Sequence, residues 1–123
     1  MPLTVRRENR HQFTVITLIG EIDRNESSRL GASIDEALRE GPPRLLFDLS
    51  RLSFIDSAGL RLLVMACSHA RRGGGSCALC SLCPAPRKIM DLTGLKAAFD
   101  IYPDLGTALD GGPLESTASL RVY

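Results

Sequence analysis

The chain has 123 residues, 44% of them hydrophobic and 5% aromatic, which is enough for one domain with a mainly aliphatic core. Its 15 Lys and Arg residues against 14 Asp and Glu residues create no field that would attract nucleic acid or an anionic membrane. No apolar run reaches the roughly 20 residues of a membrane span, and the chain enters a strand pattern without a hydrophobic signal region. We therefore expect a cytoplasmic protein that binds neither nucleic acid nor membrane.

The N-terminal part predicts a β-hairpin. Residues 3–5 have a short strand pattern, and the charged run 6–11 is typical of a solvated turn or strand end. Residues 13–19 are apolar and β-branched, which predicts a second strand antiparallel to the first. Residues 20–23 end that strand.

A helix and a central strand are expected next. Asp23, followed three residues later by Glu26, matches a capping box, and Asn25 is an alternative cap. The helix then ends at Gly41. Residues 44–49 predict a strand apolar enough to be covered on both faces. The buried stripe of the helix is predicted to consist of Leu30, Ile34, Ala37 and Leu38.

A second helix is predicted to begin around Ser57 and to end at the glycines 73–75. Helical spacing predicts two different faces on it. The core face is expected to carry Leu60, Leu63, Val64 and Cys67, and the solvent face Arg61, Ser68, Arg71 and Arg72.

The C-terminal part predicts a buried strand over residues 76–82 and a third helix over 84–92. Pro84 or Pro86 suits the first turn of that helix, because a proline there sacrifices no helical hydrogen bond. Thr93 and Gly94 close the helix. Its inward side chains are expected to be Ile89, Leu92 and Leu95.

A short fifth strand over residues 98–102 and a helical turn over 104–109 complete the pattern. The order β-β-α-β-α-β-α-β-α predicts an α/β fold, with a mixed sheet of four to five strands and covering helices. We assign residues 1–110 to this domain. Residues 111–123 are rich in Gly, Pro, Ser and Thr and are expected to form a flexible tail.

Four cysteines raise the question of a metal site or a disulfide. Cys77, Cys80 and Cys83 have the spacing C-x2-C-x2-C, with Cys67 and His69 upstream as further ligand candidates. Strand alternation, however, would send Cys77 and Cys80 to opposite faces of the sheet. We therefore expect no metal and four free thiols in a reducing compartment, and assign these cysteines no role.

The turn between the central strand and the second helix is the most informative part of the sequence. Ser57 lies where a strand ends and a helix begins, the point at which open α/β sheets gather function. Asp56 adjoins it, and Asp23 would lie near if the second and third strands are neighbours. Asp56 or Ser57 also suits a plain N-cap role, and Gly59 suits close packing of the helix start against the sheet.

These elements and motifs resemble the STAS domain, the family of bacterial anti-sigma factor antagonists. The similarity rests on Gly20-Glu21-Ile22-Asp23 after the second strand and on Asp56-Ser57-Ala58-Gly59-Leu60 after the third. Thr93-Gly94-Leu95, Phe99-Asp100-Ile101-Tyr102 and Ala108-Leu109 agree as well, so the resemblance covers residues 3–110. The triple glycine, the cysteine-rich strand and the Pro84-Ala85-Pro86 opening depart from the usual pattern.

The resemblance implies a partner-switching protein that is not an enzyme and needs no cofactor. The unphosphorylated form would bind an anti-sigma factor, which is a serine kinase, and so release a sigma factor. Phosphorylation of Ser57 would end the binding, and a PP2C-type phosphatase would restore it. We expect a monomer or weak homodimer. The expected contact residues are Asp23, Ser53, Phe54, Asp56, Ser57, Ala58, Gly59, Leu60 and Arg61, although the spacing of Leu60 equally favours the core.

Two other interpretations remain open at this point, and a third is disfavoured. The same fold could serve as a scaffold or ligand-responsive module that is not regulated by phosphorylation. Cys80 and Cys83 could form the active dithiol of a redox protein. A hydrolase using Ser57 as nucleophile is disfavoured, because Ile55 replaces the first glycine of G-x-S-x-G and only two histidines are present.

Overall fold

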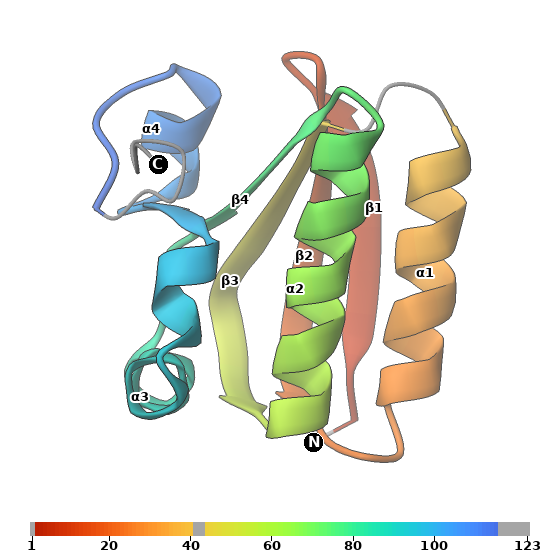
Figure 1. Cartoon of the computed structure of the whole chain (residues 1–123), viewed down its shortest axis with the longest axis vertical. Coiled ribbons are helices and arrows are strands. Elements are labelled where there is room, and N and C mark those ends of the chain that lie inside the picture. The colour runs from red at the N-terminus through yellow and green to blue at the C-terminus, as the bar shows by residue number, and fades with distance from the viewer. Residues whose placement is uncertain (1, 41–43, 116–123) are drawn as a thin grey trace.

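The computed structural model describes residues 2–40 and 44–115, and within these ranges five strands form one sheet in the order β1-β2-β3-β4-β5 (Figure 1). β1 is antiparallel to β2, and the remaining neighbours pair in parallel. The predicted mixed sheet with an antiparallel edge is confirmed. The strands are β1 (Thr4–Arg10), β2 (Phe13–Ile22), β3 (Arg44–Ile55), β4 (Ser76–Cys80) and β5 (Asp100–Tyr102).

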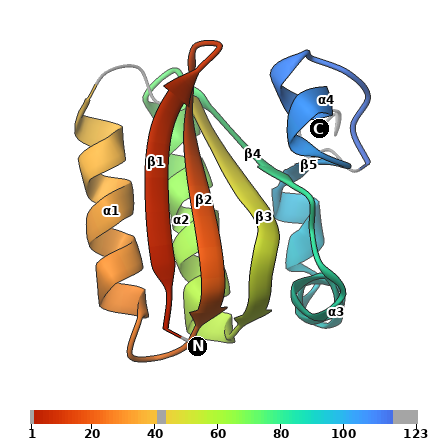
Figure 2. The same cartoon turned by 180° about the vertical axis from the view of Figure 1, so that it is seen from behind.

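The helices follow the predicted order, with one added 3-10 turn, η1, before β5. α1 and α2 lie side by side on one face of the sheet, and the view from behind shows β1, β2 and β3 with no helix in front of them (Figure 2). The elements are α1 (Ser27–Arg39), α2 (Ser57–Arg72), α3 (Pro84–Thr93), η1 (Leu95–Ala98) and α4 (Leu105–Leu109).

Two apolar clusters lie on opposite faces of the sheet, because side chains alternate along each strand. The larger packs α1, α2 and α3 against the sheet and contains Leu18, Leu30, Phe47, Leu63, Met90 and Phe99. The smaller lies under α4 and contains Val15, Leu46, Ala78, Cys80 and Ala108. The expectation that residues 44–49 are covered on both faces is confirmed, since Leu45, Phe47 and Leu49 belong to the larger cluster and Leu46 to the smaller one. The exposed Ser50 lies beyond that predicted range.

Three strands are longer than the sequence predicted, since β2 runs on to Ile22, β3 runs on to Ile55, and β1 is extended at its C-terminal end. β1 runs to Arg10, so most of the charged run is strand. Its Arg7 side chain reaches the C-terminal end of α1 and pairs with Glu36 at 3.4 Å and with the C-cap residue Glu40 at 2.9 Å. The hairpin turn falls on His11 and Gln12, whose φ angles of 50° and 71° suit the right-handed twist of the hairpin.

The predicted capping box of α1 is wrong. Glu26 is the N-cap residue and makes no side-chain cap hydrogen bond. The Asp23 carboxylate instead accepts a hydrogen bond from the Asn25 N–H at 2.9 Å, forming a local turn two residues earlier. The buried stripe is confirmed for Leu30, Ile34 and Ala37, while the predicted stop at Gly41 lies outside the described residues.

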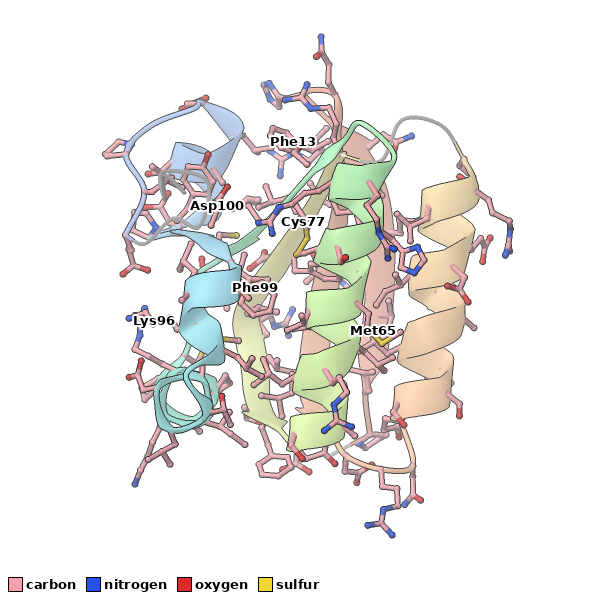
Figure 3. All side chains as sticks on the ribbon, viewed as in Figure 1. Phe13, Met65, Cys77, Lys96, Phe99 and Asp100 are labelled. Atoms are coloured by element: carbon pink, nitrogen blue, oxygen red, sulfur yellow. A yellow bond between two sulfur atoms is a disulfide. The ribbon has the colours of Figure 1, made fainter. Side chains whose placement is uncertain are left out.

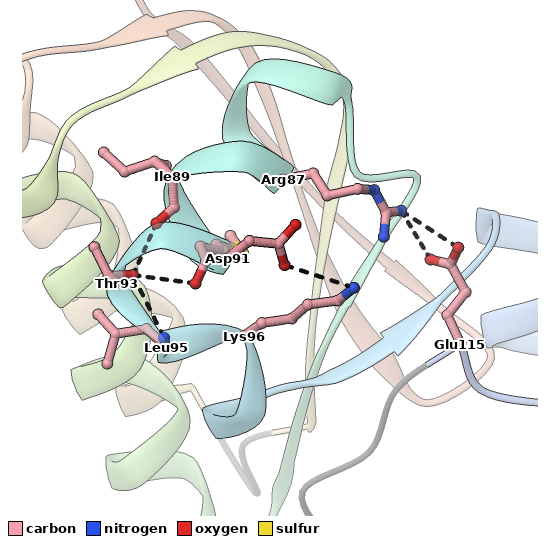
Figure 4. Close-up of polar contacts among 8 residues, drawn as sticks. Arg87, Ile89, Asp91, Thr93, Leu95, Lys96 and Glu115 are labelled. Carbon is pink, nitrogen blue, oxygen red and sulfur yellow. Dashed lines mark hydrogen bonds and ion pairs between the residues drawn. The ribbon is translucent and has the colours of Figure 1, made fainter.

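The prediction of the inward side chains around α3 is confirmed for Ile89 and Leu95, which pack half-buried against the larger cluster, and is wrong for Leu92. Leu92 is 76% exposed, whereas Pro86 and Met90 are buried, because a four-residue step along the helix keeps those two on one side. The helix ends as expected at Gly94, which has a φ of 73°. The Thr93 hydroxyl donates to the carbonyl oxygens of Ile89 and Met90, which further fixes this end (Figure 4).

The segment after α4 is described as far as Glu115. The N–H of Glu115 donates to the Ile101 carbonyl at 2.6 Å, and its carboxylate pairs with Arg87 at 3.2 Å (Figure 4). This part of the predicted tail therefore lies against β5 and α3. Residues 116–123 lie outside the described part of the chain.

The expectation of four free thiols is wrong. Cys67 of α2 and Cys77 of β4 form a disulfide, with their Cα atoms 4.9 Å apart (Figure 3). Both residues belong to the larger apolar cluster, so the packing of α2 on β4 brings them together. Cys80 belongs to the cluster on the opposite face, which confirms the predicted alternation of Cys77 and Cys80.

Candidate functional site

The candidate site forms where β2 and β3 end together. In the parallel register Ile22 pairs with Ile55, and the Asp56 N–H donates to the Ile22 carbonyl at 3.1 Å. The segments that follow the two strands therefore leave the sheet at the same edge. The sequence analysis expected Asp23 to lie near Asp56 only if the second and third strands are neighbours. The pairing of β2 with β3 meets that condition.

Asp56 is the N-cap of α2. Its backbone is extended (φ −92°, ψ 177°), and its carboxylate accepts a hydrogen bond from the Gly59 N–H at 2.8 Å. The side chain thereby satisfies one of the N–H groups that the first turn of a helix leaves without a partner. Of the two capping candidates in the sequence, Asp56 has this role.

Ser57 is the first residue of α2 and is exposed. Among the residues that the structure describes, none forms a hydrogen bond with its hydroxyl group. The hydroxyl therefore has no structural task in the described part of the molecule. It lies at a helix N-terminus, where free N–H groups favour a negative charge.

Gly59 and Leu60 pack the start of α2 onto the sheet. A Cβ atom on Gly59 would lie 2.5 Å from Cγ2 of Ile22 and 3.0 Å from Cγ1 of Ile55, so only glycine fits there without rearrangement. The side chain of Leu60 is fully buried. Both residues thus position the site by packing the start of α2 against the sheet. Leu60 was predicted as a contact residue, and its burial assigns it to the core instead.

The exposed part of the predicted set surrounds Ser57. Phe54 is 45% exposed, which is high for a large apolar side chain. Ala58 and Arg61 are exposed on the first turns of α2. Ser53 is exposed too, and its hydroxyl donates to the Gly20 carbonyl at 3.0 Å. Ser53 and Phe54 belong to the end of β3, because the strand runs beyond its predicted end at residue 49 to Ile55.

A hollow beside Ser57 was not foreseen from the sequence. It has a volume of about 530 Å³ and lies between α1 and α2, reaching Ala58 at its end near Ser57. The α1 residues that line it are mostly small and so leave room beside α2, but the sequence did not show that these residues would face α2. Its lining consists of Ser27, Ser28, Gly31, Ala32, Asp35, Ala58 and Leu62.

The two remaining thiols do not have the properties of a redox dithiol. Burial, followed by the nearby Asp48 carboxylate, raises the pKa of the Cys80 thiol to about 12. A reactive thiol has a lowered pKa, since the thiolate is the nucleophile. Cys83 is half-buried, and its thiol donates to the Ser50 carbonyl at 3.3 Å.

Within residues 2–40 and 44–115, no three His, Cys, Asp or Glu side chains are grouped closely enough to hold a metal ion. In the same ranges, none of the helices combines the length and the apolar character that a membrane crossing requires.

Comparison with known proteins identifies the family. The family model described as the STAS domain matches residues 4–108. The chain belongs to the STAS domain family. The match spans all five strands and the helices α1, α2 and α3, ends within α4, and has the Asp56–Ser57 turn at its middle.

Among the relatives of this chain are anti-sigma factor antagonists. The chain is 28% identical over 110 residues to the anti-sigma F factor antagonist of Paenibacillus polymyxa, covering 89% of this chain and 94% of the relative. The crystal structure of an anti-sigma factor antagonist from Mycobacterium paratuberculosis superposes with a TM-score of 0.80 at 31% identity, covering 89% of this chain and 92% of the other.

SpoIIAA, another anti-sigma factor antagonist, is similar in two states. Its unphosphorylated form has a TM-score of 0.75 and covers 88% of this chain and 95% of the other. The phosphorylated form from Bacillus has a TM-score of 0.68 and covers 88% and 98%. Both are 25% identical to this STAS domain.

Proposed function

We propose that this STAS domain is an anti-sigma factor antagonist whose partner surface is centred on Ser57 and is switched off by phosphorylation of that residue. The general role is supported by the anti-sigma factor antagonists among its relatives. The observation that supports the switch is the exposure of Ser57, whose hydroxyl group forms no hydrogen bond with any residue in 2–40 or 44–115. A kinase can modify such a hydroxyl without first opening the domain.

The surface around Ser57 suits a protein partner. Phe54 offers an exposed aromatic side chain, a residue type enriched in the central contacts of protein interfaces. The hollow between α1 and α2 gives room for a side chain of the partner directly beside Ala58. Arg61 adds an exposed charge on the same helix.

A phosphoryl group on Ser57 would act through charge. It adds about −1.5 to −2 charges at neutral pH. It would stand next to the Asp56 carboxylate and, on binding, would have to leave water inside the interface. In the free domain the N-terminus of α2 offsets part of this cost, because its N–H groups favour an anion. Phosphorylation is therefore tolerated by the fold and opposes the complex.

In this proposal the STAS domain carries no catalytic machinery. An anti-sigma factor serine kinase supplies ATP chemistry and is also the binding partner, and a PP2C-type phosphatase removes the phosphoryl group. Binding of the unphosphorylated domain releases the sigma factor. The domain acts in the cytoplasm as a monomer or weak homodimer.

The test combines phosphosite mapping with binding. The protein is incubated with ATP and the anti-sigma kinases of its source organism, and the modified residue is located by mass spectrometry. Affinity for the kinase is then measured by calorimetry for Ser57→Ala, Ser57→Glu and the control Ser68→Glu. Ser68 is an exposed serine near the other end of α2, so the control adds the same charge away from the site.

We expect phosphate on Ser57, full affinity for Ser57→Ala and for Ser68→Glu, and an affinity at least about 30-fold lower for Ser57→Glu. Binding without any phosphorylation, and without an effect of Ser57→Glu, would instead assign the domain to the scaffold or ligand-responsive class. Phosphate on another residue would overturn the switch at Ser57.

A further inference from the structure

The disulfide between Cys67 and Cys77 joins the second helix to the sheet. Cys67 lies in the C-terminal half of α2, and Cys77 lies in β4 opposite Leu45 of β3. The two residues are only 1% and 2% exposed. Figure 3 shows the sulfur–sulfur bond beside the Cys77 label, between α2 and the sheet. The bond is therefore a covalent clamp inside the core.

The pairing of these two cysteines is exclusive. Cys80 faces the opposite side of the sheet, in the cluster with Leu46 and Ala78. Cys83 lies before α3, with its thiol on the Ser50 carbonyl. Because neither side chain shares the space between α2 and β4, opening the clamp leaves no other partner for either sulfur within the folded domain.

The fold around the clamp does not rest on the bond alone. The turn after α2 is held by hydrogen bonds from the Gly73 N–H to the His69 carbonyl at 3.0 Å and from the Gly75 N–H to the Ala70 carbonyl at 2.8 Å. β4 is also paired with β3 along its whole length. Two reduced thiols fit the same apolar space, since free cysteine packs as a small hydrophobic residue. The domain can therefore keep its fold with the clamp closed or open.

We infer that Cys67 and Cys77 are a redox-sensitive clamp that sets how firmly α2 and β4 are held to each other. The ratio of thiols to disulfides in the surroundings decides whether the clamp is closed as a disulfide or open as two thiols. Closing consumes one molecule of a low-molecular-weight disulfide of the glutathione type. One protein thiolate attacks that disulfide and releases a first thiol. The second protein thiolate then attacks the mixed disulfide and releases another. The two cysteines lose two electrons and two protons, which the two released thiols carry away.

Burial of the clamp determines its kinetics. A thiolate must line up with the disulfide that it attacks, and the enclosed sulfur atoms allow this only when the end of α2 opens. Thiol–disulfide exchange is therefore slow in the native domain and faster under conditions that loosen α2. The closed clamp reduces the freedom of the unfolded chain across a ten-residue separation, which stabilises the domain by an amount equivalent to about 10 °C in melting temperature.

The experiment compares oxidised and reduced protein. The full chain is equilibrated with oxidised glutathione or with dithiothreitol, and the bonded cysteines are mapped by peptide mass spectrometry. Melting temperature and amide hydrogen exchange are then recorded for both forms. The same measurements are made on Cys67→Ala/Cys77→Ala and on the matched control Cys80→Ala/Cys83→Ala, which removes the two free thiols.

We expect only the Cys67–Cys77 peptide pair in the oxidised protein, and a melting temperature about 10 °C lower after reduction. In the reduced protein, amide hydrogen exchange should be faster in the C-terminal half of α2 and in β4, but not in the β1–β2 hairpin. The control variant Cys80→Ala/Cys83→Ala should show the same difference in melting temperature between oxidised and reduced protein as the wild type. Cys67→Ala/Cys77→Ala should show no such difference. A different bonded pair, an unchanged melting temperature in the wild type, or a shift that persists without Cys67 and Cys77 would overturn the inference. If the double variant does not fold, the peptide map and the wild-type shift still decide it.

Discussion

The carboxylate of Asp56 accepts the backbone N–H of Gly59 at 2.8 Å, and the residue that follows Asp56 is Ser57. The bond makes Asp56 the cap of α2, so the neighbouring serine is not needed for that role. Ser57, a residue type that favours helix starts, is thereby left exposed, and its hydroxyl forms no hydrogen bond within the described part of the chain. This division of tasks between adjacent residues is the structural basis of the proposed switch.

Asp56→Ala should destabilise the domain. Removing the cap leaves the Gly59 N–H without its acceptor and costs about 1 kcal/mol. Asp56→Asn should keep most of that stability, because asparagine also accepts from the helix amides. Urea unfolding monitored by circular dichroism measures both, with Asp35→Ala on the exposed side of α1 as the control. Equal stability of Asp56→Ala and wild type would show that the cap contributes nothing.

Alanine should have opposite effects at Gly59 and Gly31. At Gly59 the added methyl group meets Ile22 and Ile55, and overpacking of this kind costs about 1–3 kcal/mol, more than the gain in helix propensity. At Gly31 the nearest atom is 3.9 Å away, on Leu62, so alanine should stabilise α1 by about 0.5–1 kcal/mol. Thermal unfolding of the two variants checks the sign, and stabilisation of both would refute the close packing of Gly59.

Phe54→Ala should weaken partner binding and leave the domain stable. The proposed surface places this half-exposed ring beside Ser57, and loss of a central aromatic contact lowers affinity by about fivefold or more. Leu92→Ala on α3 is the matched control, since it removes an even more exposed apolar side chain away from the site. Calorimetry with the anti-sigma partner distinguishes the two, and equal losses in both variants would argue against a surface centred on Ser57.

Cys80 should make the domain less stable in alkali. Burial and Asp48 raise the pKa of its thiol from 9.0 to about 12, whereas the thiol of the unfolded chain ionises near 9.0. Between these values the unfolded state releases the proton and the folded state keeps it, so stability falls as the pH rises through this window. Urea unfolding between pH 8 and 11 should show a shallower decline for Cys80→Ala than for wild type. Parallel declines would contradict the raised pKa.

The element order and the position of the site follow from local patterns in the sequence. Period-two and period-3.6 spacing predicted the strands and helices, and the same spacing assigned Leu60 and Cys67 to the core face of α2. Alternation along β4 correctly separated Cys77 from Cys80. The turn at Asp56–Ser57 could be predicted from the sequence, because helix caps and helix starts depend on a few consecutive residues.

Contacts between distant residues were decided only by the tertiary structure. Nothing in local spacing says that Cys67 and Cys77 meet, that Arg7 reaches α1, or that a hollow opens beside Ala58. Whether Leu92 or Met90 faces inward depended on the angle at which α3 meets the sheet. These features arise from how whole elements pack against each other, and periodicity within one element does not contain that information.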